Sequence, residues 1–427
     1  MPKVVYRNPG TGELEEWITG PRPDSEVVVE FPNASTVDTI EGAVPGSLGE
    51  VRVRYKPVGG EWRQTPWQAV DPNLDYTAQV KLESLAPSTV HEVSVQARNG
   101  ESLAGRFQTA PAADHPRRVV FTVTTGTSYR DQDHPRGGFK MYGRMLALNP
   151  SFFVHTGDIV YYDRQAKSLP LARWHWQRMY SLPTNFDFHR QMASYFIKDD
   201  HDFFMNDSWP RMETRFMGEF TWQQGLEVFR EQVGMGEKTY RTIRWGKDLQ
   251  IWLVEGRDFR SPNTMPDGPE KTIWGTEQLA WFERTVRESD ATFRVLISPT
   301  PVVGPDRENK KDNHSNSNFQ YEGVRVRKFL AEHEMVVVCG DRHWQYVSVD
   351  DKTGLREYSS GPGSDDHAGG FSQEFRGPEH RYLNIVGGFL AGIVDREDGK
   401  PVLTFRHYSV DGHILNEDRV EAAANDR

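Results

Sequence analysis

The sequence predicts a layered α/β domain preceded by a small all-β module, because its pattern changes near residue 117. Before that point, short strand-like runs alternate in polarity with a period of two and are separated by Gly, Pro and Asn turns. After it, apolar strand-like runs alternate with longer helix-like segments, which is typical of layered α/β domains. Those apolar runs are 119–123, 152–156, 249–255, 293–298 and 335–340.

The first region, 1–112, is expected to be a β-sandwich. Its strand-like runs include Val27–Val29, Val51–Tyr55 and Val93–Ala97. From about residue 24 the region resembles a fibronectin type III module. The resemblance lies in Leu85-Ala86-Pro87-Ser88-Thr89-Val90-His91, which has that family's leucine and proline spacing and places His91 at its tyrosine position.

The second region, 113–427, is expected to form the α/β domain after a linker at 109–113. Residues 170–235 are rich in Trp, Phe, Met and Arg and predict a mainly helical insertion. A chain of 427 residues with 37% hydrophobic residues is long enough for about two domains, one with a substantial core.

Composition excludes several classes of partner and site. The net charge is −10 and no long basic run occurs, so nucleic acid is not expected as a partner. No run approaches the ~18 apolar residues of a spanning helix. Met1–Val4 lacks the apolar core of a signal peptide, so the protein is either cytoplasmic or has an export signal outside this sequence. The single cysteine, Cys339, excludes an internal disulfide and a cysteine zinc cage, and we expect it to be buried.

The first polar signature follows the strand-like run that ends at Thr156. Gly157 permits a tight turn, and Asp158 comes at the carboxyl end of a strand, where ligands bind in open α/β sheets. If a helical turn follows, Tyr161 faces the same way as Asp158. A carboxylate there can bridge two cations, and a phenolate favours a strongly charged ion such as ferric iron. The alternative is a simple strand-to-helix turn with Asp158 as the cap.

The second signature places three carboxylates and one imidazole within four residues, Asp199-Asp200-His201-Asp202, after an apolar run. Such close carboxylates repel one another unless cations or water separate them. Asp200 suits a metal ligand, and His201 suits a donor to a leaving group or a developing oxyanion. A solvated acidic loop is the alternative.

The third signature is Gly340-Asp341-Arg342-His343, which follows Val337-Val338-Cys339. On an extended chain Asp341 and His343 point to the same side, so both can reach one metal centre. Three strand ends with such signatures indicate a metal site more strongly than any one of them.

Other polar clusters have open interpretations. Arg257, after another strand-like run, can fork onto phosphate oxygens or form a structural ion pair. His314 lies in a polar loop, where it contacts either substrate or solvent. The Gly-rich loop 361–370 is expected to be mobile and near the site.

Together the three signatures, GDxxY, DDHD and GDxH, resemble the ordered motifs of calcineurin-like metallophosphoesterases, and most closely those of PhoD-type alkaline phosphatases. The resemblance covers roughly residues 118–410, and that family also carries an N-terminal β-sandwich. It implies that Asp158 bridges two metals, that Tyr161 and His343 bind an iron-like ion, and that Asp200 and Asp341 bind a calcium-like ion.

The resemblance also implies roles outside the metal ligands, and one departure. His201 would stabilise the transition state, and Asn206 would contact phosphate or the second metal. The family typically supplies a cysteine ligand after the first α/β strand, whereas this chain has 123–129, VTTGTSY, there. Asp131, Asp133 and His134 follow closely. The first metal site is therefore either remodelled, completed by a later ligand, or one ion short.

The expected function is metal-dependent hydrolysis of a small-molecule phosphate ester, a monoester or a diester, by a metal-activated hydroxide. The metals would be iron with calcium, or zinc or manganese. One alternative is a hydrolase of phosphotriesters or sulfates. Another is a non-catalytic surface or polymer-binding protein on a degenerate phosphoesterase fold. The sandwich and the resemblance favour a periplasmic or extracellular location, and the oligomeric state stays open.

Overall fold

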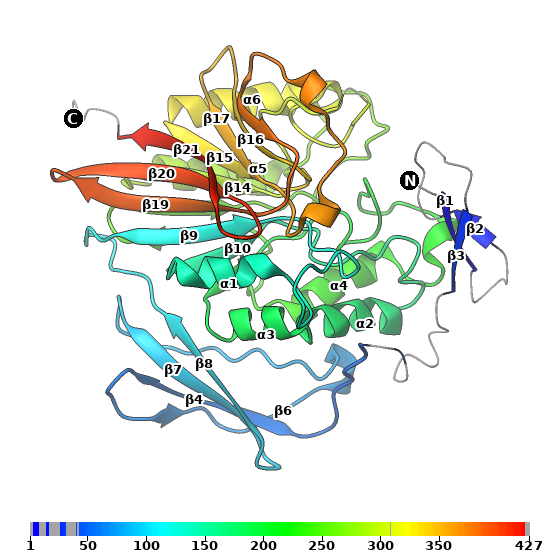
Figure 1. Ribbon diagram of the computed structural model, residues 1–427, viewed down its shortest axis with the longest axis vertical. Helices are drawn as coiled ribbons and strands as arrows, with labels where there is room; N and C mark the ends of the chain where they lie inside the picture. The colour runs from blue at the N-terminus through cyan, green and yellow to red at the C-terminus, as the bar shows by residue number, and fades with distance from the viewer. Residues whose placement is uncertain are drawn as a thin grey trace.

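The computed structural model describes residues 3–7, 14–16, 26–30, 40, 42–307 and 309–422. Its centre is a pair of β-sheets packed face to face (Figure 1). The first sheet has the order β11 (Ser194–Phe196), β10 (Phe152–His155), β9 (Val119–Thr124), β19 (Phe389–Glu397), β20 (Lys400–Tyr408), β21 (Ile414–Glu421). The second has the order β12 (Arg241–Trp245), β13 (Leu249–Leu253), β14 (Phe293–Ser298), β15 (Met335–Cys339), β17 (Arg356–Ser360), β16 (Gln345–Val349), β18 (His380–Asn384).

The main apolar core lies between the two sheets, where Phe121, Val154, Ile251, Val295 and Val338 are all buried. Strands covered on both faces need continuous apolar runs, which explains the runs seen in the sequence. β9, β10 and β11 are parallel, as are β13, β14, β15 and β17. Parallel strands end at one edge of a sheet, so the polar loops after them are brought together there.

Helices cover the outer face of each sheet and complete four layers (Figure 1). The first sheet is covered by α1 (Lys140–Ala147), α2 (Leu169–Tyr180), α3 (Pro183–His189) and α4 (Trp222–Gln232). The second is covered by α5 (Gly275–Arg287) and α6 (Gln320–Glu332). The segment 170–235 thus contains three helices, but it also contains β11, which forms an edge of the first sheet. Among the described residues no helix is long and apolar enough to cross a membrane.

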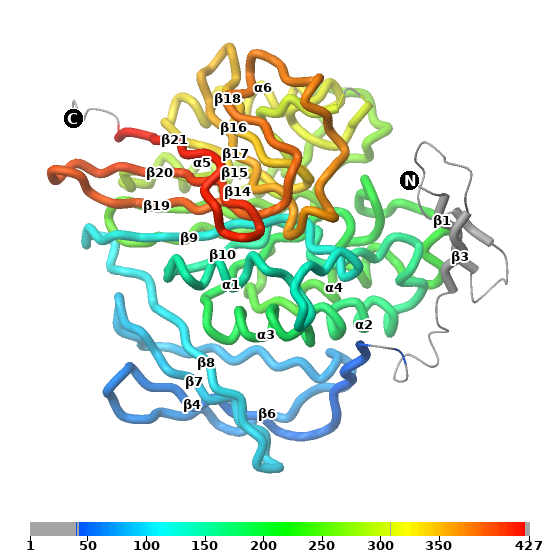
Figure 2. Tube along the Cα trace, viewed as in Figure 1, coloured from blue at the N-terminus to red at the C-terminus, as the bar shows by residue number. Residues whose placement is uncertain are grey.

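The preceding module is an antiparallel sheet that packs beside α2 and α3 (Figure 2). Its strands are β4 (Glu50–Pro57), β5 (Arg63–Gln64), β6 (Gln68–Ala69), β7 (Val90–Ala97) and β8 (Ser102–Gln108). One apolar face of this sheet, with Val53 and Phe107, lines a hollow shared with Val80 and Leu82. Polar contacts hold the module to the helices: Gln177 Nε2 donates to Asp75 at 3.0 Å.

The predicted fold class, a layered α/β domain after an all-β module, is confirmed by this architecture. One strand has a partner the sequence did not indicate. Val27–Val29 lie in β3 (Glu26–Glu30), which pairs with β1 (Lys3–Arg7) in a separate three-stranded sheet completed by β2 (Leu14–Glu16). The fibronectin III likeness and the boundary at 112 stay predictions.

Candidate metal centre

Asp158 is the buried centre of the site. Gly157 has φ 106°, and here the loop after β10 passes close to the loop after β11. A Cβ added to Gly157 would lie 2.6 Å from the Asp199 Cβ. Asp158 itself has φ 56° and is fully buried. Neither of its carboxylate oxygens accepts a hydrogen bond from any residue that the structure describes. Burial raises its pKa to about 7, and an unpartnered buried carboxylate is costly unless a cation compensates it.

The loop after β11 divides its four polar residues between scaffold and site. Asp202 fastens the loops together, because its Oδ2 accepts from Ile159 N at 3.1 Å and its Oδ1 from Asp199 N at 2.6 Å. Asp200 and His201 turn toward Asp158 instead, and ligand atoms of the three lie within 4.8 Å of one another. The acidic run is therefore an organised and largely buried element, not a solvated loop.

The loop after β15 brings Asp341 and His343 to the same edge. An added Cβ on Gly340 would lie 2.6 Å from Thr156 O, so only glycine permits this approach. Ligand atoms of Asp341, Asp158 and Asp199 lie within 4.8 Å of one another. Asp341 also pairs with Arg342. Its φ of 63° resembles that of Asp158, and such strained backbone positions concentrate at functional sites.

Two aromatic side chains lie near Asp158, Tyr161 on the same loop and His343 on the loop after β15. His343 Nε2 lies 3.8 Å from Asp158 Oδ2 and 3.4 Å from the Tyr161 hydroxyl. Burial lowers the pKa of His343 well below its usual value, so the ring is neutral, which is the form that binds metals. The Tyr161 ring lies 4.5 Å from the His201 ring, centroid to centroid.

Asp163 is a site residue that the sequence analysis missed. His201 Nδ1 donates to Asp163 Oδ2, and Asn206 N donates to Asp163 Oδ1 at 2.8 Å. Burial alone would lower the pKa of His201, but Asp163, Asp200 and Asp158 together raise it well above its usual value. His201 is therefore a charged donor fixed by one carboxylate. Its position two residues after Tyr161 was the sequence feature that could have marked Asp163 as part of the site.

Arg257 and His314 are not placed to meet a substrate. Arg257 is fully buried, and its Nε donates to Asp199 Oδ1 at 2.5 Å, in agreement with the structural ion pair that the sequence left open. His314 is also fully buried, so the expectation of a solvent-facing or substrate-facing histidine is wrong. Its Nε2 lies 3.0 Å from Glu322, and its ring packs edge-on against Trp274. Loops leave the strand ends in different directions, which sequence spacing does not reveal. Asn206 is exposed and stays a candidate phosphate contact.

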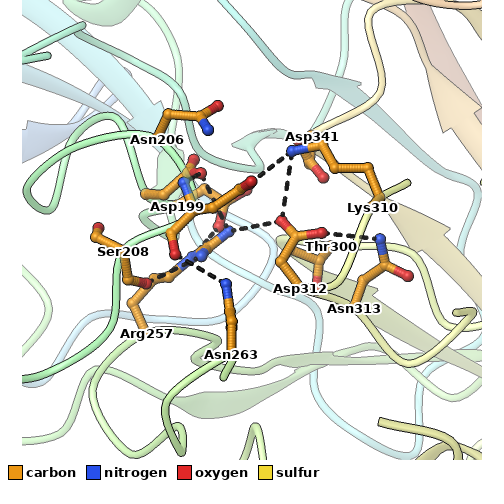
Figure 3. Close-up of polar contacts among 12 residues, drawn as sticks. Asp199, Asn206, Ser208, Arg257, Asn263, Thr300, Lys310, Asp312, Asn313 and Asp341 are labelled. Atoms are coloured by element: carbon orange, nitrogen blue, oxygen red, sulfur yellow. Dashed lines mark hydrogen bonds and ion pairs between the residues drawn. The ribbon is translucent and has the colours of Figure 1, made fainter. Parts of the chain in front are cut away.

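A second acidic cluster, Asp200, Asp207 and Asp312, shares Asp200 with the first. Figure 3 shows its member Asp312 with Lys310 and Arg257 around it. The cluster contains its own cations. Lys310 Nζ lies 2.6 Å from Asp207 and 3.8 Å from Asp312, and Arg257 Nη2 lies 3.7 Å from Asp312. The negative charge of this cluster is thus largely met within the protein.

The loop 361–370, expected to be mobile, is packed against the site. Residues 361–364 are buried, and His367 Nε2 lies 2.6 Å from the Tyr161 hydroxyl. Cys339 is buried as predicted, with its Sγ 3.1 Å from the Tyr346 hydroxyl. The polar loops of both sheets therefore converge on Asp158.

Comparison with known families decides which kind of protein has this site. The family model described as PhoD-like phosphatase matches residues 121–377, more than half of the chain. The chain belongs to the PhoD-like phosphatase family. A search of curated protein sequences found no match.

Two solved structures show the same fold. "Structure of PhoD" is 15% identical, with a TM-score of 0.72, and the match covers 89% of this chain and 83% of that one. Purple acid phosphatase PPD1 from yellow lupin (Lupinus luteus) seeds is 13% identical, with a TM-score of 0.63 over 88% of this chain and 70% of that one. The fold of this PhoD-like protein is that of the calcineurin-like metallophosphoesterases, as the motifs predicted. Family and fold support a phosphoester hydrolase that uses divalent metals and a small-molecule phosphate substrate.

Proposed function

We propose that this protein hydrolyses small phosphate esters, monoesters and diesters, with two metal ions held around Asp158. The observation that carries the proposal is the carboxylate of Asp158, which is fully buried and accepts no hydrogen bond from the described residues. Native proteins seldom leave a buried carboxylate without partners, and such groups mark functional sites.

The side chains around Asp158 fit two ions of different character. Tyr161 and His343 offer a phenol and a neutral imidazole, which with Asp158 suit iron, or alternatively zinc or manganese. Asp200 and Asp341 offer carboxylates, which with Asp158 suit a harder ion such as calcium. When bound, the ions supply positive charge against phosphoryl oxygens and lower the pKa of a nearby water.

The protein's own residues then position and stabilise the reacting groups. His201 is charged and 16% exposed on its side chain, so it can donate to a phosphoryl or leaving-group oxygen. Asp163 fixes the ring through Nδ1 and leaves Nε2 for that donation. We also propose that the exposed Asn206 contacts phosphate, and its backbone N–H donates to the same Asp163.

The test is hydrolysis of para-nitrophenyl phosphate and of bis-para-nitrophenyl phosphate. The purified protein is assayed as isolated, after removal of metal with a chelator, and after addition of iron with calcium, zinc or manganese. We expect activity to vanish with the chelator and return with metal, and the preferred ester to give the subclass. Failure of every metal to produce turnover would overturn the proposal and favour the non-catalytic binding protein.

A further inference from the structure

The turn after β9 is occupied by a second segment of the chain. Thr125 pairs with Pro362 in a parallel bridge, and Gly363 N donates to Gly126 O at 2.9 Å. The Thr125 hydroxyl donates to Gly157 O at 3.3 Å, so this side chain is tied to the Asp158 loop. Within 125–128 no residue is a cysteine, a histidine or a carboxylate. Residues 362–363 therefore pack against a turn that has no metal-binding side chain of these types.

That segment brings His367 onto the metal centre. His367 Nε2 lies 2.6 Å from the Tyr161 hydroxyl, and its ring lies 4.2 Å from the His343 ring, centroid to centroid. Gly369 N donates to His343 O at 2.9 Å, which joins the two histidine loops. At Gly126 an added Cβ would lie 3.2 Å from His367 Cδ2 and 3.3 Å from His343 Nε2. A glycine at this position thus leaves room for both rings.

A carboxylate fixes the orientation of His367. Its Nδ1 lies 2.7 Å from Asp131 Oδ2, so Nδ1 is the ring nitrogen that donates to this carboxylate and Nε2 is the one that faces Tyr161. Histidines that bind metals typically donate their other ring nitrogen to a carboxylate in this way. The side chains of His367 and Asp131 are 14% and 29% exposed, so the pair is partly accessible to solvent.

We infer that His367 is the further protein ligand of the ion held by Asp158, Tyr161 and His343, and that Asp131 is its positioning residue. The inference rests on the proposed function, because it completes one ion site of that centre. Two observations support the inference. The side chains of Tyr161, His343 and His367 converge, and the oxygens of Asp158 are buried and lack hydrogen bonds within the described chain. An imidazole in place of a thiolate makes the shell harder and insensitive to thiol oxidation.

The test measures bound metal directly. Wild type, His367→Ala, His367→Cys and His134→Ala are loaded with Fe³⁺ and Ca²⁺, with Zn²⁺ and Mn²⁺ in parallel, and passed through a desalting column. Elemental analysis then gives ions per chain, and visible absorption reports a phenolate–ferric pair. His134→Ala is the matched control, since His134 Nδ1 accepts only a local hydrogen bond, from Arg136 N at 3.2 Å. Asp131→Asn tests the positioning residue.

We expect His367→Ala to lose more affinity for the first ion than the about 10- to 100-fold that is typical of losing a ligand's positioning partner, and to lose the visible absorption, while calcium is retained. His367→Cys keeps the ion, because a thiolate is a competent ligand, with a shifted absorption. Asp131→Asn weakens binding less than His367→Ala, and His134→Ala matches wild type. Equal thermal unfolding of all variants checks the fold.

Two contrary results have different meanings. His367→Ala with the metal content and absorption of His134→Ala would overturn the role of His367 and leave the proposed function intact. Wild-type protein that binds no metal and hydrolyses neither ester would overturn both.

Discussion

Both sides of the metal centre contain buried carboxylates, but only one side pairs them with lysine and arginine side chains. On one side Arg257 and Lys310 lie among Asp199, Asp207 and Asp312. On the other side Asp158 pairs with no Lys or Arg of the described chain. Its polar neighbours there are Tyr161 and the imidazoles of His343, His367 and His201.

The difference separates scaffold from binding site. A buried ion pair is tolerated when its charges and hydrogen bonds are met internally, as they are around Arg257. Around Asp158 the chain buries a carboxylate that has no hydrogen bond from the described residues, on loops with positive φ angles at Asp158 and Asp341. Replacing a residue on the first side should therefore damage folding, and replacing one on the second should damage metal binding and turnover.

The largest effect is expected for Asp158→Asn. Turnover should fall at least about 10⁴-fold, equivalent to more than about 5 kcal/mol, because the carboxylate proposed to hold both ions is lost. Metal content should fall with it. In urea unfolding the metal-free variant should be no less stable than metal-free wild type, since an unpartnered buried charge is removed. Near-normal turnover would contradict the assignment of the Asp158 side to metal binding.

Replacement of Arg257 should act on stability instead. Arg257→Met leaves Asp199 buried without its cationic partner and Asp312 with Lys310 alone, and we expect a loss of about 3 to 5 kcal/mol in the free energy of unfolding. Lys310→Met is the matched control at a side chain that is 14% exposed, and it should lose less. If Arg257→Met folds with wild-type stability but its KM for the ester rises, Arg257 faces substrate and the assignment to the scaffold is wrong.

His201→Ala tests the charged donor beside Asp158. Turnover should fall by about 10²- to 10³-fold, or about 3 to 4 kcal/mol, the usual contribution of one oxyanion donor, with metal content unchanged. Asp163→Asn should show a smaller loss, because the ring stays but its orientation and charge are less well held. A large fall in bound metal in His201→Ala would show that His201 is a ligand.

The smallest effect is a pH dependence on the paired side. Burial alone would raise the pKa of Asp312, but Lys310 and Arg257 hold it well below its usual value. Its contribution to stability is therefore present above about pH 4 and lost as the pH falls further, by up to about 1.4 kcal/mol per unit. The measurement is the difference in unfolding free energy between wild type and Asp312→Asn from pH 6 to 3. A difference that stays constant over this range would contradict the pairing.

Much of the fold and the centre could be predicted from the sequence, because the signals are local. Apolar runs such as 335–339 have the length and composition of strands buried on both faces, and β15 is one. Asp158 and Asp341 each follow such a strand, Asp200 follows the parallel edge strand β11, and parallel strands deliver their carboxyl ends to one edge. Their positions after strand-like runs were therefore enough to predict that these three carboxylates lie at one edge.

The partners within that centre were decided only by the tertiary structure. His367 and Asp131 are 236 residues apart, and Arg257 and Asp199 are 58 apart, so no local pattern connects them. His314 looked like an exposed loop residue, yet the packing of α6 and Trp274 buries it completely. A strand fixes where a loop begins, whereas the direction of the loop depends on which distant side chains it packs against. The sequence by itself therefore determined the strands and the carboxylates at their ends, and long-range packing decided which side chains complete the site and which support it.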